Sequence, residues 1–471
     1  MEGDRATLGR LWVAIGGDAA ALDRVDLSGP RHGLPSVFDV TGLAAGAVAA
    51  THLATAELDR AVRGRVQRVA VDRRHAVVAF RSERLVEIDG AAPPSPWDAA
   101  SGHHRTGDDR LIQVHANFAH HRAGLLAELG VTPDPGDDLV AAAVGAAIAE
   151  REGAELEAAL DRRGMCGALL RSSEQWSAHP QARAVAELGV LDIERIGDAP
   201  VEPTGTEPRP LGGTRVLDLT RVIAGPVCTR VLAAHGAQVL RVDAGRLPVI
   251  ESLLPDTLLG KRSTFADLGE VEGRRTLEEL AITADVFVQS YRPGALAALG
   301  FGAEQLAERR PGIVHASLCA YGHAGPWAAK RGFDSLVQTA TGIGHAGARA
   351  AGLGQPATRP LPAQALDHGA GWILALGVIE ALRRRALEGG SWRVRTSLAQ
   401  VRDLLVSLGA VDALGVPDPT RADVADLLTV TRGRRCRVGH VAVPGSLRAT
   451  PPGWSVAGGP LGSDPPEWRP L

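Results

Sequence analysis

Lysine is nearly absent from this chain of 471 residues, where it occurs only at positions 261 and 330, and aromatic residues make up just 4%. Leucine, valine and alanine must therefore fill the protein core. The four cysteines are far apart and form no C-x-x-C pair, which argues against a disulfide framework and against a cysteine-ligated zinc site. The formal net charge is −3 and no basic stripe is present, so we expect no nucleic acid partner.

The sequence also lacks the usual signals for membranes and export. The N-terminal stretch MEGDRATLGRLW is charged and has no apolar core of the kind found in signal peptides. We find no apolar run of the length that crosses a membrane. These observations predict a cytoplasmic protein without a membrane partner.

Several common cofactor motifs are missing as well. The segment DLTRVIAGPVCTR (218–230) holds one glycine rather than G-x-G-x-x-G, which disfavours a nicotinamide or flavin pyrophosphate site. The segment LLGKRST lacks the upstream glycine of a nucleotide-binding loop, and neither G-x-S-x-G nor H-E-x-x-H occurs. A local cluster of His115, His120 and His121 is more typical of a solvated corner between strand and helix than of a metal site. We therefore expect no permanently bound cofactor and no metal.

What the sequence does contain, after residue 213, is a regular alternation of short apolar runs and helical patterns. It predicts strands at 214–220, 237–243, 285–290 and 312–322, and helices at 227–236, 276–284 and 303–310. Strands that alternate with helices are typical of parallel βαβ units. We therefore predict an α/β fold with a Rossmann-like, doubly wound parallel sheet.

Two proline-rich segments, 91–109 and 197–213, divide the chain and are typical of linkers or surface crossings. The part between them mixes strand and helix patterns, including one long Ala/Glu-rich helix over 139–163, and predicts a smaller α+β domain. The predicted division of the chain is 1–92, 108–200, 211–415 and a C-terminal tail over 416–471.

The chain also contains a faint internal repeat. The stretch LPSVFDVTGLAAGAVAATHLATAELDRA around Asp39 is similar to LPAQALDHGAGWILALGVIEALRRRA around Asp367. About thirty residues after each aspartate comes a strand pattern, VQRVAVD or SWRVRTSL. A duplication explains these similarities, although two similar helices in an alanine-rich protein would also do so.

Spacing alone leaves two interpretations of Asp367, which stands where a helix should begin. It is either the N-cap of that helix, a common use of aspartate, or a carboxylate nucleophile. In the second case the unpaired N–H groups of the helix N-terminus would support its ionised form, and the small residues Gly369 and Ala370 would let a bulky thioester approach.

Several stretches between residues 211 and 405 closely resemble the class III CoA-transferase (CaiB/BaiF) family, in the family's order and spacing. They are GTRVLDLTRVIAGPVCTRVLAAHGAQVLRVD, GKRSTFADL, ADVFVQSYRPGALAALGFGAEQLAERRPGIVHASLCAYGHAGPW, RGFDSLVQ, LDHGAGWILALGVIEALRRR and VRTSLAQ. Residues 35–75 resemble the family's nucleophile-bearing stretch, and residues 108–190 resemble its small domain. The resemblance implies a truncated copy fused to a copy with an intact Rossmann-like part. Because the family is known for two intertwined subunits, it implies a monomer with pseudo-dimeric halves or a homodimer.

The resemblance also implies a function, the transfer of CoA from an acyl-CoA to a carboxylate acceptor. Asp367 falls on the family's nucleophile position, which implies a mixed anhydride and then an aspartyl-CoA thioester; Asp39 falls on the same position of the truncated copy and is expected to be a relic. The implied CoA site lies at the C-terminal ends of the strands and comprises Val222, Ala224, Arg246, Ser290, Tyr291, Arg292, Ala295, Leu299 and Arg331. Lys261 and Arg262 are further candidates for contacts with the CoA phosphates.

Two alternatives stay open. The racemase branch of the same family, which acts on 2-methylacyl-CoA, needs an acid/base pair and carries histidine in a GHD motif. Here the motif is GFD, and Phe333 cannot accept a proton, which favours the transferase. The other alternative is a non-catalytic CoA-binding protein or partner subunit.

Overall fold

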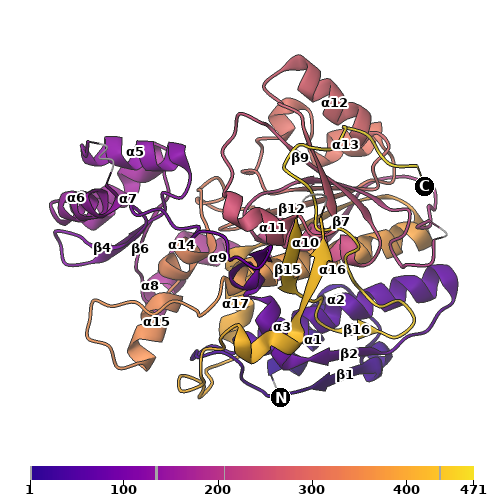
Figure 1. Cartoon of the computed structure of the whole chain (residues 1–471), viewed down its shortest axis with the longest axis horizontal. Helices are drawn as coiled ribbons and strands as arrows, with labels where there is room; N and C mark the ends of the chain where they lie inside the picture. Colours follow the sequence, from indigo (N-terminus) through magenta and orange to yellow (C-terminus); the bar gives the residue numbers. More distant parts are fainter. Residues whose placement is uncertain (1–2, 133–135, 206, 434–435, 471) are drawn as a thin grey trace.

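A mixed seven-stranded sheet forms the centre of the larger part of the molecule (Figure 1). The computed structural model describes residues 3–132, 136–205, 207–433 and 436–470. In spatial order the strands are β10 (Lys261–Phe265), β9 (Gln238–Asp243), β8 (Arg215–Leu219), β11 (Val286–Gln289), β12 (Val314–Cys319), β13 (Ser391–Ser397) and β7 (Asp192–Gly197). Only β7 runs antiparallel to its neighbour. The α/β class with a parallel sheet was predicted from the sequence and is confirmed.

The central strands β8 and β11 are buried on both faces of the sheet, which explains why they are largely apolar. Val216 and Val286 belong to the core shared with α10 (Ala224–Ala234) and α16 (Ala365–Glu388). Leu217 and Phe287, one residue further along, belong to the core under α12 (Val271–Ala281) and α13 (Ala303–Arg309). Successive side chains of a strand point to opposite faces, so both faces of these two strands carry buried apolar residues.

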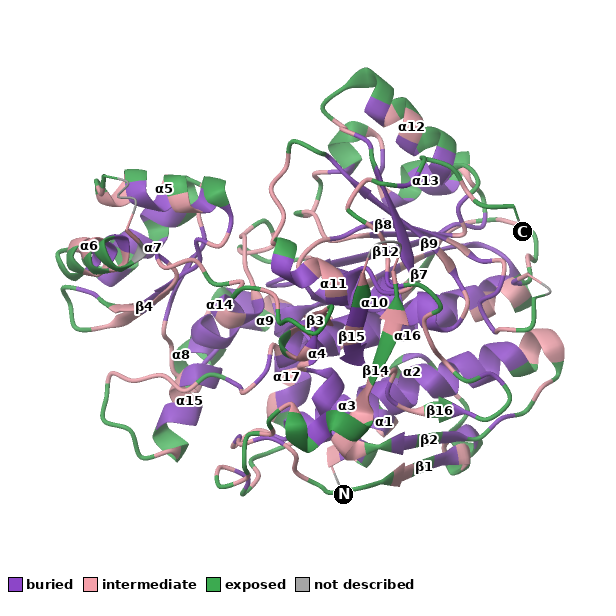
Figure 2. Ribbon diagram, viewed as in Figure 1, coloured by how far each residue is buried: buried purple, intermediate pink, exposed green. Residues whose placement is uncertain are grey.

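The long helix α16 is the core of the molecule. It is long and apolar enough to cross a membrane, so the expectation that no apolar run reaches that length is wrong. The whole apolar stretch is nevertheless buried, between the sheet, α10 and the equally long helix α2 (Val40–Arg63) (Figure 2). Its composition therefore reflects burial on all sides by protein.

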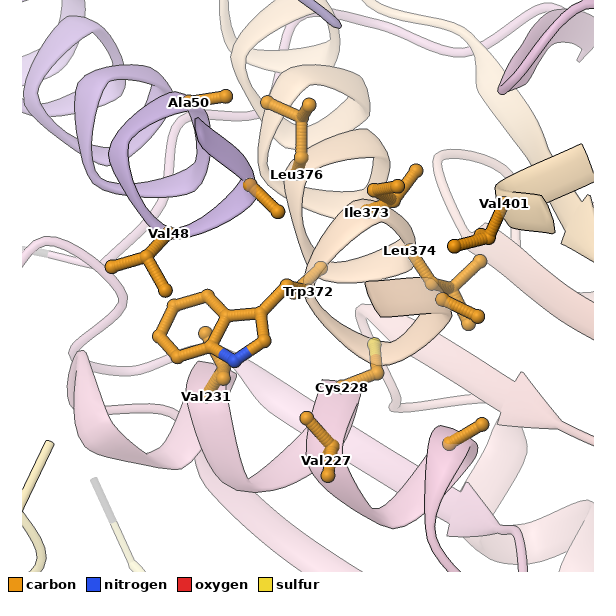
Figure 3. Close-up of a cluster of buried hydrophobic side chains, with 14 of the residues drawn as sticks. Val48, Ala50, Val227, Cys228, Val231, Trp372, Ile373, Leu374, Leu376 and Val401 are labelled. Atoms are coloured by element: carbon orange, nitrogen blue, oxygen red, sulfur yellow. The ribbon is translucent and has the colours of Figure 1, made fainter. Parts of the chain in front are cut away.

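The contact between α16 and its neighbours depends on one small residue followed by one large one. A Cβ atom on Gly371 would lie 2.6 Å from the carbonyl oxygen of Ala224 and 2.6 Å from Cβ of Val227, so only glycine lets α16 approach α10 this closely. The next residue, Trp372, lies between Val48 of α2 and Val231 of α10 (Figure 3). The indole thus fills the space where the three helices meet.

A smaller unit projects from the main body (Figure 1) and has its own hydrophobic core. It contains the sheet β4 (Gly102–Arg105), β5 (Leu111–Val114) and β6 (Gly167–Leu169), with the helices α5 (Ala119–Leu129), α6 (Asp137–Ala149) and α7 (Gly153–Arg162). The single helix predicted over 139–163 is wrong. The carboxylate of Glu152 accepts from the backbone N–H of Glu155 at 2.8 Å and starts α7 as a separate helix.

The chain before residue 92 and the chain after residue 415 are joined by strand pairing. Two small sheets contain strands from both parts of the chain. One consists of β1 (Val25–Ser28), β2 (Val69–Asp72) and β16 (Ser446–Leu447). The other consists of β14 (Leu428–Arg432), β15 (Arg437–Val441) and β3 (Glu87–Ile88). The final segment then crosses to the large sheet, where Asp464 accepts from the backbone N–H of Ser263 at 3.1 Å. The four-part division of the chain and its origin by fusion stay predictions.

The remaining elements connect these layers. The α-helices are α1 (Gly3–Ala14), α3 (Arg73–Ala79), α4 (Ser82–Leu85), α8 (Ser173–Ala178), α9 (Pro180–Ala186), α11 (Leu254–Thr257), α14 (Asp334–Ala340), α15 (Ile343–Ala350) and α17 (Leu398–Ser407). The 3₁₀ turns are η1 (Ala19–Arg24), η2 (Glu251–Leu253), η3 (Ala297–Leu299) and η4 (Ala422–Leu427). Two of these helices, α4 and α14, supply residues to the site described next.

Candidate active site

Asp367 lies in the first turn of α16, three residues after the N-cap residue Gln364. The backbone N–H groups of Leu366 and Asp367 donate to one carboxylate oxygen of Asp334, at 2.8 and 2.9 Å. The interpretation of Asp367 as the N-cap is therefore wrong. The expectation that unpaired N–H groups of this helix support an ionised Asp367 is also wrong, because Asp334, the first residue of α14, occupies two of them.

This arrangement places two carboxyl groups close together in a buried site. Burial raises the pKa of Asp334 to about 6, despite the hydrogen bonds that it accepts. Burial, together with the negative charges of Asp334 and Glu83, raises the pKa of Asp367 well above the ordinary range. Among the described residues, none forms a hydrogen bond with the Asp367 carboxyl. A carboxylate of raised pKa is a better base and nucleophile once it is ionised.

The residue after Asp367 connects the site to the N-terminal part of the chain. His368 is fully buried, and its Nε2 atom lies 2.9 Å from Oε2 of Glu83 in α4. Phe80 stacks on the imidazole with ring centroids 5.5 Å apart. Burial alone would raise the pKa of Glu83, but the hydrogen bond and the charge of His368 lower it below its ordinary value. The start of α16 is thus held by residues more than 280 positions earlier in the chain.

Two cavities meet at Asp367. The first has a volume of about 380 Å³ and is called here the arginine cavity, because it is lined by Arg221, Arg292 and Arg331. The second has a volume of about 420 Å³ and is called the proline cavity, because it is lined by Pro93, Pro94 and Pro96. The walls that they share contain Val222, Ile223, Phe333 and Asp367. The arginine cavity lies at the C-terminal ends of β8 and β11, where the strand order reverses and where open α/β sheets bind ligands.

Most residues that the sequence indicated for the CoA site lie together on this cavity wall. Those that line the arginine cavity are Val222, Ala224, Ser290, Tyr291, Arg292, Ala295, Arg331 and Asp367. They come from the turns after β8 and β11, from the segment before α14 and from the start of α16. The structure therefore brings together residues up to 145 positions apart.

Four other candidates lie elsewhere. Arg246 forms an ion pair with Asp267 and, like the exposed Leu299, is not part of either cavity wall. Lys261 is fully buried against Asp218, so it cannot contact a CoA phosphate. Arg262 donates to backbone oxygens of the C-terminal segment, among them that of Glu467 at 2.7 Å. The contacts of these three cations are structural.

Asp39 does not correspond to Asp367 in space. It is the N-cap of α2, where its carboxylate accepts from the backbone N–H of Gly42 at 2.7 Å, whereas Asp367 lies three residues inside α16. Asp39 lines neither cavity. Its placement fits a capping role.

Sequence reasoning missed several residues of the site. Arg221 lines the arginine cavity and lies over the ring of Tyr291, with its guanidinium carbon 5.3 Å from the ring centroid. Its position directly after the first βα strand was a signal, because ligands bind at that edge of the sheet. The prolines at 93–96 carried no such signal, because their pattern is that of a linker.

The histidine cluster of the small unit is also part of the site. Its interpretation as a solvated corner is wrong for His115 and His121, whereas His120 is exposed. His115 and His121 are 6% and 5% exposed. The ring of His115 stacks on Phe333 with centroids 3.7 Å apart and lines the proline cavity. Nε2 of His121 lies 2.9 Å from Nη1 of Arg331 in the arginine cavity. Within the described ranges, no group of three or more His, Cys, Asp or Glu residues is arranged to hold a metal ion.

The chain matches known CoA-transferases over much of its length. Residues 211–443 match the model of the CoA-transferase family III. The probable fatty acyl-CoA transferase Rv3272 of Mycobacterium tuberculosis is 32% identical over 276 residues, covering 54% of this chain and 66% of that protein. The acetyl-coenzyme A transferase nodX of Hypoxylon pulicicidum is 33% identical over 261 residues, covering 52% and 44%. Human succinyl-CoA:glutarate CoA-transferase is 33% identical over 149 residues, covering 29% and 34%.

Among solved structures, that of Rv3272 from M. tuberculosis is similar, with 33% identity, a TM-score of 0.37, and coverage of 42% of this chain and 57% of that one. Residues 211–443 of this chain belong to family III of the CoA-transferases. The aligned part of the chain spans 44% of the length of nodX and 66% of the length of the M. tuberculosis transferase Rv3272.

Proposed function

We propose that this chain is an acyl-CoA:carboxylate CoA-transferase with Asp367 as its nucleophile. The observation that carries the proposal is the position of Asp367 on the wall shared by the arginine and proline cavities. In this arrangement one cavity holds the CoA part of a thioester and the other holds its acyl group, so that the thioester carbonyl lies beside Asp367. An acyl-CoA and a carboxylate acceptor are the substrates, and no permanent cofactor takes part.

The proposed reaction keeps the activated acyl group on the enzyme. A carboxylate oxygen of Asp367 attacks the thioester carbon, the C–S bond breaks, and CoA leaves as a thiolate with a mixed anhydride left behind. The thiolate then attacks Cγ of Asp367 and displaces the donor as a free carboxylate. The acceptor carboxylate attacks the same carbon of the aspartyl-CoA, and the thiolate finally attacks the acceptor carbonyl and restores Asp367.

The arginine cavity supplies positive charge for the phosphates of CoA. Arg292 is exposed on the turn after β11, and Arg331 is oriented by its contact with His121. Burial, the neighbouring His120 and the charge of Arg331 lower the pKa of His121 to about 3. The neutral ring can therefore accept a hydrogen bond from Arg331 and hold the guanidinium at the cavity wall.

Arg292→Gln is expected to raise KM for acyl-CoA by about tenfold and to leave kcat within about twofold, because a phosphate contact far from the reacting carbon contributes equally to ground and transition states. The measurement is steady-state transfer at several salt concentrations, and the effect should shrink as salt rises. Arg246→Gln is the matched control, because Arg246 is paired with Asp267 outside both cavities. Equal effects of the two substitutions would contradict the assignment.

Isotope transfer tests the proposed function. With an acceptor labelled with ¹⁸O in its carboxylate, a single turnover should leave one ¹⁸O atom in the enzyme, on the peptide that contains Asp367. The reason is that the bridging oxygen of the second anhydride comes from the acceptor and stays on Asp367 when the thiolate attacks. Mass spectrometry of the digested protein measures this. Formation of acceptor-CoA without label in the enzyme would contradict the mechanism.

One observation favours a second candidate, a racemase of 2-methylacyl-CoA. His115 stacks on Phe333 in the proline cavity. The site therefore contains an imidazole although position 333 is not a histidine. Burial lowers the pKa of His115 to about 4, and the neutral ring can accept a proton. A racemase would exchange the α-hydrogen of the thioester with deuterated water and would transfer no ¹⁸O. A non-catalytic CoA-binding protein would do neither.

We further propose that residues 1–92 take the place of a partner subunit within one chain. The packing of α2 against α16, the contact of Glu83 with His368 and the presence of Glu83 and Arg84 in the wall of the proline cavity support this. Such a chain would complete its active site as a monomer with pseudo-dimeric halves.

A further inference from the structure

The carboxyl group of Asp367 forms no hydrogen bond with any described residue, so its position depends on the backbone that carries it. That backbone is the first turn of α16, in which the N–H of His368 donates to the carbonyl oxygen of Gln364 at 3.0 Å. Asp334 holds this turn from one side, through two backbone N–H groups. A reactive side chain keeps a precise position only when neighbouring residues fix its support.

A second hold on the same turn comes from the N-terminal part of the chain and acts on the side chain of His368. Oε2 of the nearly buried Glu83 lies 2.9 Å from Nε2 of His368, and no part of the imidazole is exposed. Although burial alone would raise it, the pKa of Glu83 lies below its ordinary value because of His368, so the ionised carboxylate accepts from Nε2. The ring of Phe80 stacks on the imidazole with the ring planes 24° apart. These two contacts fix the residue that follows Asp367.

Glu83 also acts on Asp367 through its charge, and both side chains line the proline cavity. Burial raises the pKa of Asp367, and the negative charges of Asp334 and Glu83 raise it further. Arg84 lies beside Glu83, with Nε 3.5 Å from Oε1, but its side chain is 42% exposed and solvent screens its charge. Burial lowers the pKa of all three histidines of the cluster, so they are neutral at pH 7. The remaining charged groups on the two cavity walls are Arg221, Arg292, Lys330 and Arg331.

We propose that Glu83 is a positioning residue for Asp367, which holds the first turn of α16 through His368 and whose negative charge opposes ionisation of the nucleophile. This rests on the proposed function, because it assigns Glu83 a role in the same reaction. A carboxylate that ionises less readily is a stronger nucleophile once it is ionised. The helix α4 thus delivers one carboxylate from residues 1–92 to the start of α16, without contact between that carboxylate and the reacting atoms.

Glu83→Gln separates the charge from the hydrogen bond. The amide oxygen still accepts from Nε2 of His368, so kcat at its pH plateau should stay within about threefold. Asp367 must be ionised to attack, and loss of the neighbouring negative charge lowers its pKa, so the acid limb of the kcat profile should move to lower pH. The ratio of kcat on this limb to kcat at the plateau should rise by about threefold or more. A merely structural contact would lower the plateau and leave the limb in place.

Glu83→Met and His368→Phe remove the hydrogen bond from either end. Each should lower kcat at the plateau by about tenfold, with a smaller change in KM, because a displaced nucleophile slows the chemical step. If Glu83 positions Asp367 through His368, the double variant should lose no more than the more affected single variant. It also leaves no unpaired buried carboxylate and should unfold at least as late on heating as His368→Phe. Additive losses of kcat, or full kcat in the folded double variant, would overturn the positioning role.

Glu87→Gln is the matched control, because Glu87 lies four residues later, is paired with Arg421 and lines neither cavity. Its kcat profile should keep its position. A readout without turnover is the ¹³C NMR titration of the Asp367 carboxyl carbon, assigned by its absence in Asp367→Asn. This titration should move to lower pH in Glu83→Gln, and an unchanged titration would overturn the inference and leave the proposed function intact. If the unsubstituted protein transfers no acyl group and takes up no ¹⁸O while the titration still moves, the proposed function fails and the link between Glu83 and Asp367 survives.

Discussion

Asp367→Asn is expected to reduce acyl transfer by at least about three orders of magnitude, because an amide cannot form the anhydride and loss of a nucleophile removes the covalent route entirely. The substitution preserves the size of the side chain. It also keeps the backbone N–H groups that donate to Asp334, so α16 should begin at the same residue. The measurement is the rate of acceptor-CoA formation, together with the mass of the protein after incubation with acyl-CoA.

Asp39→Asn is the matched control for this experiment. Asparagine caps helices about as well as aspartate, and position 39 lies outside both cavities, so activity should stay within about twofold. Full activity in Asp367→Asn would exclude Asp367 as the nucleophile. Loss of activity in Asp39→Asn alone would show that the aspartate of the N-terminal part is functional.

Lys261→Met should lower the free energy of unfolding by about 3–5 kcal/mol, the usual effect of removing one partner from a buried ion pair. The Nζ atom of Lys261 lies 2.9 Å from Oδ2 of Asp218, and neither side chain is exposed at all. Burial lowers the pKa of Lys261 to about 8, so the ammonium is still charged at neutral pH. The substitution would leave the Asp218 carboxylate buried without its counter-charge. Chemical denaturation followed by circular dichroism measures the change.

The double substitution Asp218→Asn with Lys261→Met distinguishes this cause from lost packing. The side-chain amide introduced at position 218 keeps an acceptor oxygen for the backbone N–H of Thr220, which lies 3.0 Å from Oδ1 of Asp218. If the unpaired charge is the cause, the double variant should be more stable than Lys261→Met by about 1 kcal/mol or more. A double variant as unstable as the single one would point to packing instead.

The strands could be predicted where burial on both faces makes them apolar, as in residues 214–220 and 285–290. The strand Lys261–Phe265 has no such signal, because its buried lysine is paired with Asp218 rather than replaced by an apolar residue. The break between the two helices within residues 139–163 is stabilised by Glu152, which caps α7, and the helical composition on both sides conceals it.

For the site, the sequence indicates the edge of the sheet but not its surroundings. The sequence predicted site positions for Asp367, Ser290 and Arg331, because each follows or begins a recognisable element of the family's pattern. The roles of Asp334 and Glu83 depend on contacts across 33 and 285 residues, which no local pattern encodes. The same applies to His115, which approaches Phe333 only because the small unit packs beside α14.

The pairing of β16 with β2 has a consequence for biogenesis. Residues 69–70 of β2 pair antiparallel with residues 446–447 of β16. In addition, Nε2 of the buried His52 lies 2.7 Å from the backbone oxygen of Pro444. During translation the N-terminal segment therefore emerges hundreds of residues before this partner exists. Contacts of such long sequence separation form late and slow the folding of the chain. Until residues 446–447 have been synthesised, the edge of β2 that β16 will cover stays open, and an open strand edge can pair with other chains.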